Sequence, residues 1–181
     1  MGRNYSPSTR EVVGDLICGL HVETTKGVLV AANFTTGGTN TSIFNIYGRI
    51  GIMQLFLELT AAADANATQV LFYVTFTTPV IALNAMCAKC DSIASLGAYG
   101  RIAYVGGAVA TQAIITDSAG LTDASLGYMK GIVGGESSAG VNTVGVIGMQ
   151  ASDATQAGSI AATGHIFYVP MSPGAYVTAA V

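Results

Sequence analysis

Residues 69–77 read QVLFYVTFT, and this stretch decides the fold class. Every second position from Val70 to Phe76 is large and apolar, and Gln69, Leu71, Tyr73, Thr75 and Thr77 occupy the alternate positions. Successive side chains of a β-strand point to opposite faces, so the pattern predicts a strand. Leu71 and Tyr73 make the second face partly apolar. Either a neighbouring molecule covers that face, or the strand is central and the fold covers it on both sides.

Residues 49–59, RIGIMQLFLEL, predict a second strand. We expect one face to carry Met53, Leu55, Leu57 and Leu59, and the opposite face to carry Gln54, Phe56 and Glu58. The Leu, Glu and Ala content of residues 52–63 also suits a helix. Glycines at positions 48 and 51 and the threonine-rich strand that follows favour the strand.

Short strand candidates continue along the chain, at 12–22, 26–32, 42–48, 79–84, 101–106, 111–116, 143–149, 164–170 and 174–180. Turn signals rich in Gly, Asn and Asp separate them. Many short strands without an amphipathic helix predict an all-β sandwich or barrel, as a single domain over residues 11–181. The polar residues 1–10 predict an extended N-terminal arm. Residues 117–142 alternate weakly and predict a long excursion, either a loop with a small sheet or one helical turn.

The second informative feature is the scarcity of charge. Charged residues make up 9% of the 181 residues, hydrophobic residues 51%, and the net charge is −3. An ordinary globular protein is about 25% charged. High apolar content excludes disorder, and the lack of a basic run excludes a nucleic-acid partner. We interpret the surface as one that other protein subunits largely cover, the alternative being a monomer coated with Thr, Ser and Asn.

Two long stretches without charge, 65–88 and 154–181, raise the question of a membrane span. Polar residues, glycine and proline interrupt both, and neither contains the roughly 20 continuous apolar residues that a span needs. The first fifteen residues contain Arg3, Arg10, Glu11 and Asp15 and no apolar run, so we expect no signal peptide. The prediction is a chain made in the cytoplasm, with no membrane partner.

Three cysteines argue against a disulfide framework, and two of them form the motif Cys87-Ala-Lys-Cys90. Two thiolates at this spacing can hold one side of a zinc ion. A full site would need ligands from Cys18, His21 or His165, which come from distant predicted strands. A redox role would need a βαβ context, which the sequence lacks. Buried, inert thiols are the expected state, with no metal and no cofactor.

Both histidines, His21 and His165, sit within predicted strands among apolar neighbours. Such a position favours a structural or interface role over that of a catalytic base. The carboxylates are scattered, and no phosphate-binding loop or nucleophile elbow occurs. We therefore expect no enzyme and no catalytic residues. A β-sandwich that binds a small ligand stays open as an alternative.

Three segments resemble a family of tailed-bacteriophage virion structural proteins. They are FNIYGRIGIMQLFLELT at 44–60, CAKCDSIASLGAYGRIAYVG at 87–106, and GHIFYVPMSPGAYVTAA at 164–180. Together they cover roughly 55 residues. The second segment departs from the family pattern at Cys90, and residues 117–142 have no counterpart in it.

The resemblance implies a head decoration, or cement, protein on the surface of the capsid. Such proteins are β-sandwiches or jelly rolls, often homotrimers, that clamp neighbouring major capsid subunits. It implies that the chain is made in the host cytoplasm and binds both itself and the major capsid protein. We expect the arm to contact the capsid through Arg3, Asn4, Tyr5 and Arg10. The alternative is another virion component, such as a tail, fibre or spike module that binds a receptor.

Overall fold

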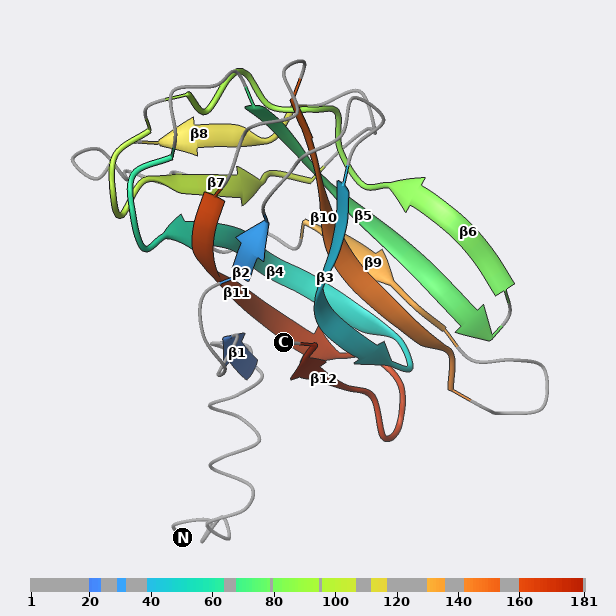
Figure 1. Cartoon of the computed structure of the whole chain (residues 1–181). Coiled ribbons are helices and arrows are strands. Elements are labelled where there is room, and N and C mark those ends of the chain that lie inside the picture. The colour runs from blue at the N-terminus through green and yellow to red at the C-terminus, as the bar shows by residue number, and fades with distance from the viewer. Residues whose placement is uncertain are drawn as a thin grey trace, which may run out of the picture.

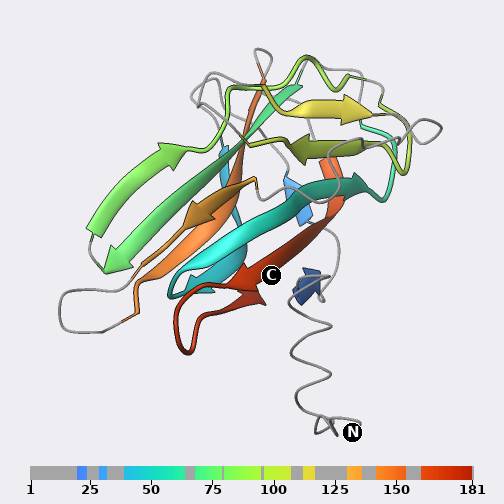
Figure 2. The same ribbon diagram turned by 180° about the vertical axis from the view of Figure 1, so that it is seen from behind.

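The fold consists of two β-sheets packed face to face (Figure 1). The computed structural model describes residues 20–23, 29–31, 39–63, 68–78, 80–94, 96–106, 112–116, 130–135, 142–153 and 160–180. Within these ranges the chain forms twelve strands and no helix. The view from behind shows the same two layers, with β4 and β11 in one and β5 and β10 in the other (Figure 2).

Each sheet is antiparallel. The five-stranded sheet has the order β12-β3-β10-β5-β6, and its strands are β3 (Thr39–Tyr47), β5 (Thr68–Thr78), β6 (Val80–Ala85), β10 (Val144–Asp153) and β12 (Tyr176–Ala179). The seven-stranded sheet follows the path β1-β11-β4-β7-β8, with β2 beside β11 and β9 beside β4. Its strands are β1 (Leu20–Glu23), β2 (Leu29–Ala31), β4 (Ile50–Leu59), β7 (Arg101–Tyr104), β8 (Ile114–Thr116), β9 (Gly131–Val133) and β11 (Ile160–Pro170).

The strand order is that of a jelly roll. The chain crosses from one sheet to the other between β2 and β3, β3 and β4, β4 and β5, β6 and β7, β9 and β10, β10 and β11, and β11 and β12. As a result β11 lies between β1 or β2 and β4, while β10 lies between β3 and β5. This interleaving of early and late strands distinguishes a jelly roll from a simple sandwich. The expected all-β, jelly-roll-like sandwich is confirmed, and the expected arm at 1–10 lies outside the described residues.

Two edges of the larger sheet are each shared by two short strands. Along β11, β1 pairs with residues 165–168 and β2 with residues 160–162. Along β4, β7 pairs with residues 55–58 and β9 with residues 50–52. The segment between β7 and β9 therefore leaves the edge of β4 and returns to the same edge.

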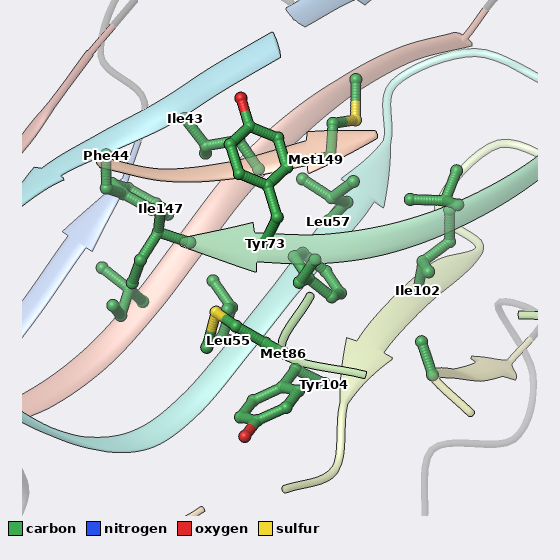
Figure 3. Close-up of a cluster of buried hydrophobic side chains, with 14 of the residues drawn as sticks. Ile43, Phe44, Leu55, Leu57, Tyr73, Met86, Ile102, Tyr104, Ile147 and Met149 are labelled. Carbon is green, nitrogen blue, oxygen red and sulfur yellow. The ribbon is translucent and has the colours of Figure 1, made fainter. Parts of the chain in front are cut away.

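The core fills the space between the sheets (Figure 3). Leu55 and Leu57 from β4 meet Phe44, Ile147 and Met149 from the opposite sheet. Phe72 of β5 and Tyr104 of β7 pack edge to face, with ring centroids 6.4 Å apart. Burial at about 25 cal/mol per Å² of apolar surface makes this layer the main stabilising element.

The predicted alternation in β4 holds from Leu55 to Leu59 and is wrong at Met53. Leu55, Leu57 and Leu59 are buried, but so are Ile50 and Ile52, whereas Met53 is half-buried. The register with β11 shifts between Phe167 and Tyr168, which places an extra residue in β4 at this point. A β-bulge reverses the parity of a strand, so side chains beyond it change face.

Leu71 and Tyr73 point away from the core on β5 and are nevertheless buried, with 7% and 5% of their surface exposed. For these two residues the chain itself provides the cover, so the second of the two sequence interpretations is right. Within residues 117–142 the structure describes 130–135 and 142, and these include the short strand β9, which joins the seven-stranded sheet beside β4. The rest of the predicted excursion lies outside the described residues.

Candidate interaction surfaces

The residues predicted to contact a capsid, Arg3, Asn4, Tyr5 and Arg10, lie outside the described residues. The third cysteine, Cys18, lies outside them as well. Of the other residues singled out from the sequence, Cys87, Cys90 and His165 have described side chains, and His21 has a described backbone position in β1.

The two thiols of the CxxC motif are buried acceptors of backbone hydrogen bonds. Cys87 Sγ accepts the N–H of Phe72 at 3.3 Å, and Cys90 Sγ accepts the N–H of Val70 at 3.2 Å. The backbone N–H groups of Met86 and Cys90 donate in turn to the carbonyls of Phe72 and Val70, at 2.8 and 2.9 Å. The motif therefore runs along β5 and takes the place of a paired strand beyond the end of β6.

Burial also sets the protonation of these thiols. It raises the pKa of the Cys87 thiol, and it raises the pKa of Cys90 to about 11. Zinc and nucleophilic chemistry both require the thiolate, which these surroundings disfavour. Among the described residues no three His, Cys, Asp or Glu side chains gather at a metal-binding distance.

The outer face of the seven-stranded sheet carries a polar and aromatic row across β11, β4 and β7. The Phe56 ring stacks on His165 with centroids 4.8 Å apart, and the Arg101 guanidinium carbon lies 5.3 Å from the Phe56 centroid. Arg101 Nε donates to Glu58 Oε2 at 2.6 Å. The Phe56 ring thus lies between the His165 ring on one neighbouring strand and the Arg101 guanidinium on the other. These contacts fix the positions of the His165 and Arg101 side chains.

The strand register extends this row to β1. Glu23 lies opposite His165, and His21 lies opposite Phe167. The twelve strands contain six Asp, Glu, Lys, Arg or His residues, and five of them belong to this one sheet: His21, Glu23, Glu58, Arg101 and His165. Sequence reasoning identified the two histidines and missed the row, because its members come from four separate strands.

The five-stranded sheet is almost free of charge. Within the bounds of its strands the single Asp, Glu, Lys, Arg or His is Asp153, at the end of β10. Six outward-facing residues form two rows across β12, β3 and β10, which we call the neutral band: Tyr176, Tyr47 and Val144, then Thr178, Asn45 and Val146. The Tyr47 and Tyr176 rings stack at 4.3 Å.

Tyr73 lies flat on the outer side of this sheet because of a glycine in the neighbouring strand. A Cβ atom at Gly148 would come within 2.3 Å of the Tyr73 ring. Without that atom, the ring can cross β10 to hydrogen-bond with Ser42 on β3. Gly148 therefore permits the close approach of ring and backbone.

Three connections meet at the end of the sandwich where β3 leads into β4, and hydrogen bonds join them. The N–H of Gly48 donates to the carbonyl of Thr143 at 2.8 Å, and Thr143 Oγ1 accepts the N–H of Gly135 at 2.8 Å. Ser172 Oγ accepts the N–H of Arg49 at 3.0 Å. We call this junction, formed by 48–49, 134–135, 142–143 and 171–175, the loop end.

Exposed apolar side chains gather around the loop end. The described residues include seven large hydrophobic side chains that are exposed, and five of them lie at this end: Val80, Ile132, Val144, Met171 and Tyr176. Arg49 is exposed in the same region. Tyr, Met and Arg are enriched in the centres of protein interfaces. Because hydrogen bonds already fix the backbone of this junction, binding a partner here would cost little conformational entropy.

Fold and surfaces together define the class: a jelly-roll β-sandwich with a neutral face, a charge-bearing face and an apolar end. Comparison with protein-family models, curated proteins and solved structures finds no match for this chain. In the described part of the chain, no helix is long and apolar enough to cross a membrane.

Proposed function

We propose that this chain is a bacteriophage head decoration protein, which binds the outer capsid lattice and clamps neighbouring major capsid subunits. The observation that carries the proposal is the near absence of charge from the five-stranded sheet, whose described strands contain Asp153 alone. A soluble protein that works alone uses surface charge to stay apart from its copies. A component of a lattice instead offers neutral surface for contact.

The positions of the resembling segments support the proposal. Residues 44–60 include β4, residues 87–106 include β7, and residues 164–180 include most of β11 and all of β12. β4 pairs with both β7 and β11, and β12 pairs with β3. The three segments thus form one continuous part of the fold. Viral capsid proteins are among the users of jelly rolls, as are lectins and cupins, so the fold is compatible with the role without defining it.

The action proposed is mechanical and involves no catalysis or cofactor. A protein that touches several capsid subunits at once gains effective affinity from multivalency, with no single strong contact. Because it binds the assembled shell and not free subunits, it stabilises the shell by mass action. The partners are the major capsid protein and further copies of the chain, on the surface of the virion.

Binding to heads tests the role. The purified chain is mixed with undecorated heads of the phage whose genome encodes it, and the mixture is sedimented. We expect the full chain to sediment with heads and to raise their melting temperature. A chain without residues 1–10 should stay in the supernatant while keeping the circular dichroism and melting temperature of the full chain. Equal binding by both chains would contradict the role of Arg3, Asn4, Tyr5 and Arg10.

Electron microscopy of labelled virions separates this role from the alternative. Label on the head surface supports decoration. Label on the tail or its tip, with no binding to heads, would replace decoration with a tail, fibre or spike role, and residues 117–142 would then be the first place to seek a receptor-binding loop.

A further inference from the structure

The fold brings the two histidines of the chain, which are far apart in the sequence, onto adjacent strands of one sheet. β1 pairs with β11 antiparallel, and the register sets His21 opposite Phe167 and Glu23 opposite His165. His165 and Phe167 are two residues apart on β11, so His21 and His165 are diagonal neighbours across the pair. Glu23 completes a set of three residues, His21, Glu23 and His165, which we call the β1–β11 triad.

All three residues of the triad lie on the outer face of the seven-stranded sheet. Burial alternates along β11, where Ile166 and Tyr168 are buried in the core and His165 is half-buried. Residues directly opposite each other in an antiparallel pair share a face, and so do residues two apart on one strand. The register of β1 with β11 contains no shift, so His21 and Glu23 occupy the same face as His165.

The spacing of the triad suits a single metal ion. Directly opposite residues have Cβ atoms about 4.5–5.5 Å apart, and diagonal neighbours lie about 7–8 Å apart. Residues two apart on one strand are separated by roughly 7 Å. The side chains of His and Glu reach several bonds beyond Cβ, so three of them at these positions can converge on one point above the sheet. The structure describes the side chain of His165 and the backbone of His21 and Glu23, so the triad is defined by strand register.

The surroundings of His165 are compatible with a bound cation. The Phe56 ring stacks on the His165 ring with 17° between their planes. Stacking uses the face of an imidazole, whereas a metal is bound by a ring nitrogen in the plane of the ring. Arg101 lies on β7, which β4 separates from β11, and its guanidinium donates to Glu58. Because this positive charge is paired and one strand further away, it opposes a cation at the triad only weakly.

We propose that His21, Glu23 and His165 bind one divalent transition-metal ion, such as Zn²⁺, on the outer face of the seven-stranded sheet. Two imidazoles and one carboxylate form the ligand set of many zinc and ferrous iron sites. Ca²⁺ and Mg²⁺ prefer sets made of oxygen alone. Three protein ligands leave at least one coordination position for water.

The ion would fasten the edge strand β1 to β11. Both strands would then be joined by a bond to metal as well as by their backbone ladder, and the binding free energy would add to the stability of the fold. This role goes beyond the proposed capsid function and does not depend on it. Its test uses the purified chain without heads, so failure of metal binding leaves head binding standing, and the reverse also holds.

The test is a zinc titration of the full chain, purified without an affinity tag and stripped of metal with a chelator. Because the chain has two histidines, its NMR spectrum contains two sets of imidazole signals. We expect both sets to shift together and to stop shifting at one Zn²⁺ per chain. Mg²⁺ at the same concentration should leave both sets unchanged. A shift of one set alone, or no shift of either, would overturn the proposal.

Calorimetry of variants identifies the ligands. His21→Asn, Glu23→Gln and His165→Asn should each lower the affinity for Zn²⁺ by at least about tenfold, since even a lost outer-shell partner costs that much. The matched control is Glu58→Gln, which removes another carboxylate from the same sheet and should bind Zn²⁺ like the wild type. Full affinity in a triad variant, or an equal loss in the control, would contradict the assignment of ligands.

Hydrogen exchange of the wild-type chain tests the structural role of the ion. We expect Zn²⁺ to slow exchange of the β1 amides, while those of β12, in the opposite sheet, exchange at the same rate with and without zinc. Exchange in β1 that ignores zinc would show that the ion does not fasten this strand.

Discussion

Val70 and Phe72 lie where β5 extends beyond the end of β6, so their backbone N–H groups face a position that no strand fills. The thiols of Cys90 and Cys87 accept these two hydrogen bonds. The spacing of the motif matches two donors on the same edge of one strand. For this pair, a sequence signature that elsewhere indicates metal or redox chemistry serves the hydrogen bonding of a sheet.

Removing one of these thiol acceptors should therefore lower stability more than replacing its sulfur with oxygen. We expect Cys90→Ala to lower the free energy of unfolding by about 1–3 kcal/mol, because it leaves the buried Val70 N–H without a partner. Cys90→Ser keeps an oxygen acceptor and should cost less. Urea unfolding of the two variants measures the difference, and equal losses would contradict the role of sulfur as an acceptor.

The same thiol predicts a loss of stability in alkali. Burial raises the pKa of Cys90 from the ordinary 9.0 to about 11 in the folded chain. The folded state thus favours the protonated thiol. The contribution of this thiol to the free energy of unfolding is therefore complete below pH 9 and is lost as the pH rises toward 11. The contribution is on the order of 3 kcal/mol. Unfolding measured from pH 8 to 11 should show the decline, and Cys90→Ser should reduce it.

Tyr168 makes the equivalent contribution at the β12 edge. In Tyr168→Phe the buried N–H of Val177 loses its acceptor, and we expect a loss of about 1–3 kcal/mol in the free energy of unfolding. Hydrogen exchange at Val177 should accelerate as well. Tyr176→Phe is the control, because Tyr176 is 46% exposed and its ring can still stack on Tyr47.

At the scale of the element, the sequence predicted strands well and their irregularities poorly. Alternation located β4, β5 and β11 because each has one face in the core, and burial imposes period two. The bulge at Met53 and the short strand β9 escaped prediction, since a register shift depends on the partner strand. The scarcity of charge in the strands could be predicted from the sequence. The Phe56, His165 and Arg101 row could not, because pairing between distant strands creates it.

The loop end gives a prediction about how elements are joined. Gly134 has φ +80°, and a Cβ atom there would lie 1.9 Å from the Gly48 carbonyl oxygen. Gly134→Ala must therefore displace the β3–β4 turn and adopt a strained backbone, and we expect a loss of at least 2 kcal/mol. Gly97→Ala is the control, since a Cβ atom there meets nothing within 4 Å. Thermal unfolding should separate the two variants clearly.

At the scale of the whole molecule, scarcity of charge predicts how contacts respond to salt. Head binding through Arg3 and Arg10 should weaken between about 0.05 M and 0.5 M salt, because added ions screen exposed charges. Sedimentation with heads at the two salt concentrations measures the change. Binding that is equal at both concentrations would contradict a charge-based contact through these two arginines.

The return of the chain to the same side of β4 has a practical consequence. β7 and β9 lie end to end on that strand, so the sheet is complete whatever length of chain connects them. A foreign peptide inserted between β8 and β9 would lengthen this connection and leave the hydrogen bonds between the strands of the sheet intact. The molecule is in this respect a scaffold for carrying epitopes, and on a decorated particle it would present them in many copies.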